Sequence, residues 1–279
     1  LAKNASLPAP VSPDVSPDIK PPVSSDIPRP VNPDVSRIPE RGVAPALPEG
    51  TNGEIASVKP ELVLGKGPSD SLDRAARMLS ECGLEKGDLV VDRRTGLVRL
   101  NADMGWDLSE RVVSSDGFID QVKSLPVLTA SLPEGTSVAA VGIELTGAAL
   151  LAGEASEVRV LKVTGAESVQ LMEYAGSAAE FGDGRFTVLE GNGRIAGDLS
   201  RSGRYVLTLF IKDGGEYDLD GRANGRIVDP ALLLSVEPWA AQTPEPKPKP
   251  GPETPRGGSG GGGGCDTGFL WGWLLLLAV

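Results

Sequence analysis

The chain has 279 residues, a formal net charge of −11 and no histidine. The negative charge repels phosphate backbones, so nucleic acid is excluded as an expected partner. The lack of histidine excludes Ser-His-Asp and Cys-His catalysis and imidazole zinc sites, and the 36 glycines and 24 prolines indicate long linker segments.

Residues 1–48 form a proline-rich segment with an imperfect repeat. The sequence VSPD occurs at 11–14 and 15–18, and VNPD occurs at 31–34. Each proline restricts its own φ and favours extended geometry in the residue before it, and few apolar residues are available for a core. The composition predicts a disordered, extended stalk of about 3.1 Å per residue.

A small α+β unit is predicted over residues 53–124, and it begins with a helix. One helical face would carry Leu72, Ala75, Ala76, Leu79 and Cys82. Gly83 is a suitable residue for the end of this helix, because glycine readily adopts a left-handed conformation. Cys82 is expected to be buried as a small hydrophobic residue.

Two apolar runs, at 88–92 and 97–100, follow the helix. They flank the sequence RRTG at 93–96. A four-residue turn that ends in glycine between two such runs predicts a β-hairpin. Residues 101–124 show no clear pattern, and a short helix over 117–124 is the interpretation considered there.

Residues 125–236 are predicted to form a β-sandwich module. Val141, Ile143 and Leu145 alternate with smaller or polar residues, which predicts a strand with one buried face. The run at 205–211 is apolar at nearly every position, which predicts a central strand. Further strands are expected at 157–163, 169–172 and 185–189. The fold class is therefore mainly β: an antiparallel sandwich, with the helix-plus-hairpin unit packed against it and disordered linkers on both sides.

The densest acidic stretch, residues 211–230, is the candidate metal site. Asp213, Asp218, Asp220 and Asn224 offer oxygens of the kind that calcium prefers. Part of the stretch resembles the start of a calcium-binding loop, but Ile227 stands where the closing glutamate would be. The favoured alternative is that these side chains form turns and bind backbone amides. A catalytic carboxylate pair is the least favoured reading, and no catalytic or cofactor-binding residue is predicted.

The C-terminal part consists of a Pro/Gly-rich linker at 237–264 and a short tail at 265–279. The tail follows a glycine run and contains Cys265, Asp266, Thr267 and then the apolar sequence GFLWGWLLLLAV. Twelve helical residues reach roughly 18 Å, whereas a bilayer core is about 30 Å thick. We therefore expect a transmembrane segment that continues beyond Val279 and is followed by a basic cluster.

This glycine run, cysteine and apolar segment resemble the Synergist-CTERM sorting signal, a C-terminal signal of surface proteins. The resemblance implies export, membrane insertion by the tail, processing near Cys265 and display at the cell envelope or cell surface. The implied partners are the membrane and the sorting machinery. Because an exported chain needs a signal peptide and none is visible after Leu1, we expect that one precedes Leu1 or has been removed.

Three functions compete on these observations. The favoured hypothesis is a non-enzymatic, surface-anchored protein that displays a β-rich module on a stalk. The alternative is a calcium-dependent module that binds a glycan or protein ligand outside the cell. The third hypothesis, a hydrolase with two carboxylates, would need its two groups about 5–9 Å apart.

Overall fold

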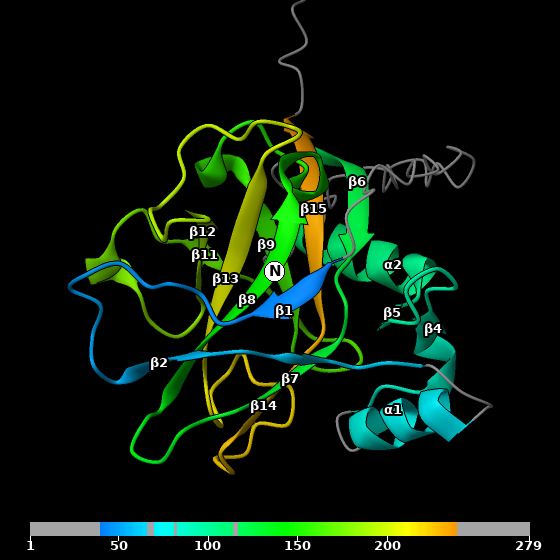
Figure 1. Ribbon diagram of the computed structural model, residues 1–279. Coiled ribbons are helices and arrows are strands. Elements are labelled where there is room, and N and C mark those ends of the chain that lie inside the picture. Colours follow the sequence, from blue (N-terminus) through cyan, green and yellow to red (C-terminus); the bar gives the residue numbers. More distant parts are fainter. Residues whose placement is uncertain (1–39, 66–69, 81–82, 114–116, 239–279) are drawn as a thin grey trace, which may run out of the picture. The chain divides into compact units, whose positions relative to one another are not determined.

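The computed structural model describes residues 40–65, 70–80, 83–113 and 117–238, all within one compact unit of the chain (Figure 1). The helices are α1 Asp70–Ser80 and α2 Ala102–Val113. The strands are β1 Arg41–Val43, β2 Ile55–Val58, β3 Glu61–Leu62, β4 Leu89–Val91, β5 Val98–Leu100, β6 Gly117–Ser124, β7 Leu128–Ser131, β8 Val138–Thr146, β9 Arg159–Val163, β10 Val169–Leu171, β11 Glu173–Tyr174, β12 Arg185–Glu190, β13 Arg204–Lys212, β14 Arg226–Asp229 and β15 Ala231–Pro238.

The main sheet has the strand order β1-β8-β13-β12-β11. Strand β2 also pairs with β8, in parallel. It pairs with the residues of β8 that come just before those paired with β1. Strand β13 is bonded to β8 on one side and β12 on the other, so the predicted central strand is confirmed. Its alternating residues reach two cores: Leu207 and Leu209 face the sandwich interior, and Phe210 stacks on Phe181 at the other face.

The facing layer combines two sheets, β10-β9-β15-β6 and β14-β7-β3. Strand β6 continues into β7 through residues 125–127, and β14 continues into β15 through Pro230. The pairs β15–β6 and β14–β7 are both antiparallel, so these four strands form one long ribbon that changes sheets at Pro230. Proline suits this position because it has no amide hydrogen to donate to a ladder.

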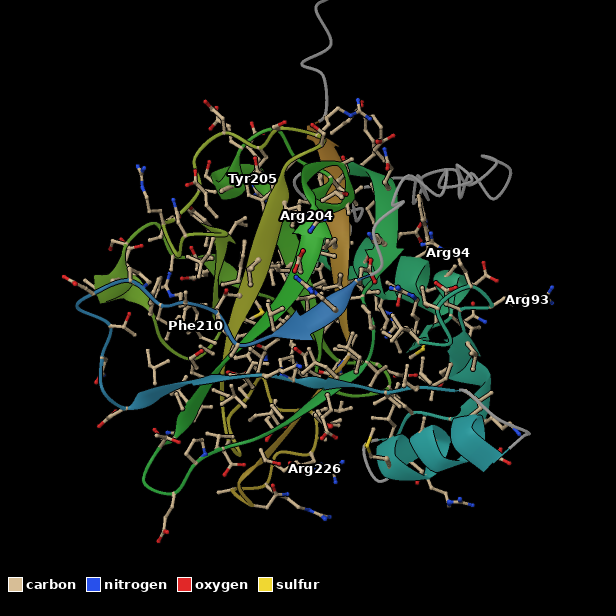
Figure 2. The ribbon with its side chains drawn as sticks, in the orientation of Figure 1. Arg93, Arg94, Arg204, Tyr205, Phe210 and Arg226 are labelled. Atoms are coloured by element: carbon tan, nitrogen blue, oxygen red, sulfur yellow. The ribbon has the colours of Figure 1, made fainter. Side chains whose placement is uncertain are left out.

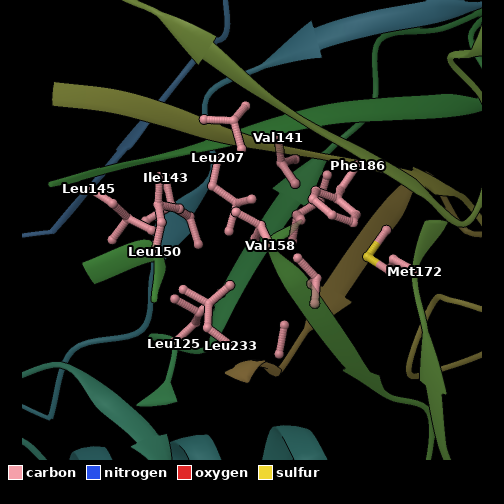
Figure 3. Packing of buried hydrophobic residues seen from close by; sticks show 14 of the residues in the cluster. Leu125, Val141, Ile143, Leu145, Leu150, Val158, Met172, Phe186, Leu207 and Leu233 are labelled. Atoms are coloured by element: carbon pink, nitrogen blue, oxygen red, sulfur yellow. The ribbon is translucent and has the colours of Figure 1, made fainter. Parts of the chain in front are cut away.

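The main core lies between the two layers (Figure 3). Val141, Ile143 and Leu207 from the main sheet share this cluster with Val158 and Leu233 from the opposite layer. Buried residues at alternate strand positions are expected when two sheets pack face to face. The prediction of a mainly β, sandwich-like fold is thus confirmed.

The helix-plus-hairpin unit packs on the other face of the second layer, as predicted. Leu161 of β9 and Leu232 of β15 contribute to one core with Leu79 of α1, Leu100 of β5 and Leu108 of α2. On α1, Ala75 and Leu79 are buried, in agreement with the predicted apolar face. Gly83 has φ +83°, the left-handed conformation expected beyond the end of this helix.

The predicted hairpin is formed by β4 and β5, with Leu89 opposite Leu100. Its turn is stabilised by Asp92, whose carboxylate accepts the amide hydrogens of Arg94 and Thr95. Gly96 closes the turn with φ +72°. The burial of Asp92 opposes ionisation, but these hydrogen bonds prevail and lower the pKa of its carboxyl.

The helix considered over 117–124 is wrong, because these residues form strand β6. The apolar residues Ile119 and Val122 are three apart, a spacing that suggests a helix. A register shift in the β6–β15 pairing leaves Asp120 without an opposite residue on β15. A β-bulge of this kind turns the side chains of Ile119 and Val122 to the same face. Both side chains therefore pack on the core shared with the helices.

Strand β8 also differs from its prediction, because both of its faces are buried rather than one. Ala140 joins a small outer core with Val138, Ala175 and Phe210. Gly142 lies directly against Val43 of β1, and a Cβ atom there would come within 2.8 Å of that residue's carbonyl oxygen. Small residues in β8 therefore allow neighbouring segments to pack closely against this strand.

The structure bears on two of the expected domain limits. Strand β1 lies inside the range 1–48 assigned to the stalk, so residues 41–43 belong to the main sheet. Strand β6 pairs with β15, so hydrogen bonds cross the limit drawn at 124. Cys82, Cys265, residues 1–39 of the stalk, and the predicted linker and tail from residue 239 onward lie outside the described residues. Across the described ranges, no helix combines the length and hydropathy needed to span a bilayer.

Candidate functional site

The acidic loop, residues 213–225, connects β13 to β14 and contains all four predicted metal ligands. Asp213 lies at the start of the loop, and its carboxylate binds backbone amides at the end of the loop. The Oδ1 atom of Asp213 accepts the amide hydrogen of Asn224 at 3.1 Å, and Oδ2 accepts that of Gly225 at 2.7 Å. Asp213 therefore closes the loop through hydrogen bonds between its carboxylate and the backbone.

Asp220 and Asn224 make a second set of local hydrogen bonds. The Oδ1 atom of Asp220 accepts the amide hydrogen of Arg222 at 2.9 Å, and Oδ2 accepts the side-chain amide of Asn224 at 2.8 Å. The Oδ1 atom of Asn224 accepts the amide hydrogen of Arg226. These are the turn-forming contacts of the favoured alternative. Over the ranges that the structure describes, no group of three acidic or cysteine side chains is placed to hold a metal ion, and calcium binding remains an untested prediction.

Asp218 differs from the other acidic residues of the loop because it is buried, with 3% of its surface exposed. Its Oδ2 atom accepts the amide hydrogen of Gly214 at 3.1 Å, and Oδ1 accepts that of Val228 at 3.2 Å. Burial, aided by the charge of Asp220, raises the pKa of Asp218 to about 6, although the two amides and Lys162 favour the ionised form.

Lys162 and Asp229 form an ion pair that is completely buried. Lys162 lies on β9 and Asp229 is the last residue of β14. In the described part of the chain, Oδ2 of Asp229 accepts no hydrogen bond although it is buried. An unpaired buried carboxylate oxygen is costly, so this arrangement needs a physical explanation.

Asp218 lies next to this pair through the backbone of β14. Its Oδ1 atom accepts the amide hydrogen of Val228, the residue before Asp229. The amide of Leu219 donates to the carbonyl oxygen of Val228 at 3.3 Å. The interior therefore holds one lysine and two neighbouring carboxyl groups, which we call the buried triad: Lys162, Asp218 and Asp229.

Asp218 was among the site residues predicted from the sequence, whereas Lys162 and Asp229 were not. A detectable signal did exist for Lys162, because it alternates with Leu161 and Val163 and shares the parity of Val160. A lysine at an inward position of an apolar strand needs a partner. No sequence signal linked it to Asp229, which is 67 residues away.

A separate cleft of about 700 Å³ lies between three segments that are distant in the sequence. Its lining includes Arg41, Lys59 and Arg94, together with Leu62, Leu64 and Leu97. Arg94 is labelled in Figure 2, and Leu64 is 48% exposed. The cleft therefore combines cationic and apolar side chains on a chain that is acidic overall, and one of these cations, Arg41, is already paired with Glu144 at 2.6 Å.

Glu40 is the acidic residue in the lining of this cleft, and it is neutralised locally. It forms ion pairs with Arg99 and with Lys123, the latter at 2.9 Å. Burial of Glu40 would raise its pKa, but Lys123 and Arg99 together hold the pKa below its ordinary value. Because Glu40 is matched by two cations, it adds little negative field to the cleft.

Comparison with known proteins adds no assignment: no protein-family model, no curated protein and no solved structure matches the chain.

Proposed function

We propose that the chain is a non-enzymatic surface protein that displays a β-rich module and is sorted by its C-terminal segment. The observation that carries this proposal is the order of segments after the module. Strand β15 ends at Pro238, and the sequence then passes through a Pro/Gly-rich stretch, the glycine run, Cys265 and the apolar tail. A stiff spacer followed by a flexible one would hold the module away from a membrane.

The state of the acidic side chains supports a non-enzymatic role. Both carboxylate oxygens of Asp213 and of Asp220 accept hydrogen bonds within the loop, and those of Asp218 accept the backbone amide hydrogens of Gly214 and Val228. A hydrolytic carboxylate pair has to reach its substrate and a water molecule. The geometry of the loop favours a structural role for these residues.

Sorting would act at Cys265. The sequence places this cysteine between a glycine run and an apolar segment, where a processing enzyme would act, and its thiol is the group to which a lipid would be attached. One acyl chain gives only marginal membrane binding, so stable anchoring would require a second chain or the intact tail.

Mass spectrometry of the protein isolated from its own cells tests the sorting step. We expect a mature chain that ends near residue 265 or carries a lipid on Cys265. The Cys265→Ser variant should keep its apolar tail and lack the lipid. An unmodified Cys265 followed by an intact tail in the native protein would contradict the processing step.

The cleft favours a second candidate function, the binding of an acidic peptide. Lys59 and Arg94 are exposed residues of its lining, and the exposed Leu64 and the half-buried Leu62 supply apolar surface there. Among the described residues, the lining includes no aromatic side chain of the kind that stacks on sugars. Cationic and apolar groups together match an extended peptide with carboxylate side chains.

Titration with poly-L-glutamate at low and physiological salt tests the second candidate. We expect binding that weakens with salt and falls several-fold in the Lys59→Ala/Arg94→Ala variant. Arg194→Ala/Arg201→Ala, which removes two exposed cations outside the described cleft lining, is the matched control. Equal binding by all three proteins would exclude the cleft as the binding site.

A further inference from the structure

We propose that Lys162 and Asp229 become joined by an intramolecular amide bond, formed by the chain itself in the core of the module, with Asp218 as the group that transfers the proton. The inference is independent of the surface role, since it rests on three buried side chains and on the strands that hold them.

The backbone places the two reacting groups against each other. Lys162 is directly opposite Ala231 in the β9–β15 pairing, two residues beyond Asp229. The amide of Val163 donates to the carbonyl oxygen of Pro230 at 3.1 Å, which fixes the end of β9 at the sheet change. The Nζ atom of Lys162 contacts Oδ1 of Asp229, so the amine lies beside the carboxyl carbon that it would attack.

The surroundings favour condensation over a lasting ion pair. Both side chains are fully buried, and the inward neighbours Val160, Ile227 and Ala231 belong to the main apolar core. An apolar interior makes a separated pair of charges costly, and the neutral amide would remove both charges. Within the described ranges, Oδ2 of Asp229 accepts no hydrogen bond, so no donor holds this oxygen in place and it is the one that would depart as water.

Asp218 supplies the proton transfer. Its carboxyl accepts a hydrogen bond from the amide of Val228, the residue before Asp229, which holds it near the pair, although it forms no hydrogen bond or ion pair with Lys162 or Asp229. Burial raises the pKa of Asp218 to about 6, so this carboxyl exchanges protons near neutral pH. A carboxyl that both takes up and returns a proton is the assistance that amide formation requires.

The step balances without an oxidant or a cofactor. A proton first passes from the Lys162 ammonium to the Asp229 carboxylate within the ion pair. The Nζ lone pair then attacks Cγ of Asp229, and an N–C bond forms. Asp218 takes one proton from the nitrogen and returns a proton to the departing oxygen. The C–O bond breaks, one water molecule leaves, and a secondary amide remains between the two residues.

The bond would tie together two strands of the sandwich. It would enclose the chain between positions 162 and 229, which includes β10, β11, β12 and the central strand β13. A link between residues this far apart restricts the unfolded chain and stabilises the fold, as other covalent cross-links do.

Intact-mass spectrometry of the full chain, produced in cells that lack the proposed sorting machinery, purified in detergent and then denatured, tests the proposal. We expect a mass about 18 Da below that of the sequence, since one water is lost in forming the bond. After trypsin digestion, we expect residues 160–185 to be linked to residues 227–256, because an acylated Lys162 resists cleavage. A mass equal to that of the sequence, together with cleavage after Lys162, would overturn the proposal.

Variants separate the bond from ordinary packing. Lys162→Met/Asp229→Leu preserves apolar packing and should fold without the mass deficit. Asp218→Asn should form the bond at least tenfold more slowly, whereas Asp220→Asn, a change in the same loop, should form it at the wild-type rate. A wild-type rate in Asp218→Asn would remove the proposed role of Asp218, and a mass deficit that persists in the double variant would overturn the assignment to Lys162 and Asp229.

Discussion

Lys162 and Asp229 meet at the point where the ribbon of β14 and β15 changes sheets, and both side chains are wholly buried. The pair joins β9 of one sheet to β14 of another, beside Pro230. Buried ion pairs often stabilise a fold little more than apolar residues of the same size. Its position at the sheet change, with Asp218 nearby, is therefore more informative than its expected contribution to stability.

The loss of stability on breaking the Lys162–Asp229 pair should depend on whether a charged group remains buried. Both Lys162→Ala and Lys162→Met/Asp229→Leu lack the proposed amide bond, so the difference between them reports the buried charge alone. Lys162→Ala leaves the Asp229 carboxylate buried without its cation and should be about 3–5 kcal/mol less stable than the double variant, in which no charge remains. Chemical denaturation of the three proteins measures the difference, and a double variant less stable than Lys162→Ala would contradict this expectation.

Asp218 should make the stability of the module depend on pH. Burial and the charge of Asp220 raise its pKa in the folded protein from 3.8 to about 6, so the folded state retains a proton that the unfolded state has lost. Its contribution to the free energy of unfolding therefore falls by roughly 2–3 kcal/mol as the pH rises from about 4 to 7. The difference in stability between wild type and Asp218→Asn should follow this slope, and parallel pH profiles would refute the assignment.

The acidic loop should be stabilised by its own hydrogen bonds. Asp213→Ala removes the acceptor of the Asn224 and Gly225 amides and should lower the free energy of unfolding by about 1–2 kcal/mol, with or without calcium. Thermal melting with calcium and with chelator should give the same midpoint. A calcium-dependent rise in wild type that Asp220→Asn abolishes would instead support the calcium hypothesis, since saturation at about 100 times the dissociation constant adds roughly 2.7 kcal/mol.

The helices and the sandwich should unfold together. Leu79 of α1 is fully buried in the core that also contains Leu161 and Leu232. Leu79→Ala should cost about 2–5 kcal/mol and lower protection of β9 and β15 in hydrogen exchange as well as that of α1. Exchange that increases in α1 alone would indicate two independent units.

Local patterns predicted the elements that depend on local chemistry. The hairpin at Asp92 and Gly96 and the end of α1 near Gly83 follow from turn and capping preferences that act within a few residues. The continuous apolar run of β13 predicted a central strand because both faces of such a strand must be covered.

Other features depend on contacts that sequence spacing does not encode. Ile119 and Val122 share a face only because of the bulge opposite β15, so their spacing suggested a helix. Asp218 and Asp220 are two residues apart and looked equivalent, yet Asp218 is buried beside β14 while Asp220 stays in the turn. The cleft is lined by three separate segments, and no single stretch could have predicted it.

Protease treatment of intact cells tests the surface role most directly. In cells that naturally make the chain, the account predicts that added protease releases a folded fragment containing residues 40–238 while a cytoplasmic marker stays intact. The Cys265→Ser variant, which lacks the thiol at the proposed sorting step, is the control for sorting. A module that becomes accessible to protease only after the cells are broken would contradict the proposed display at the cell surface.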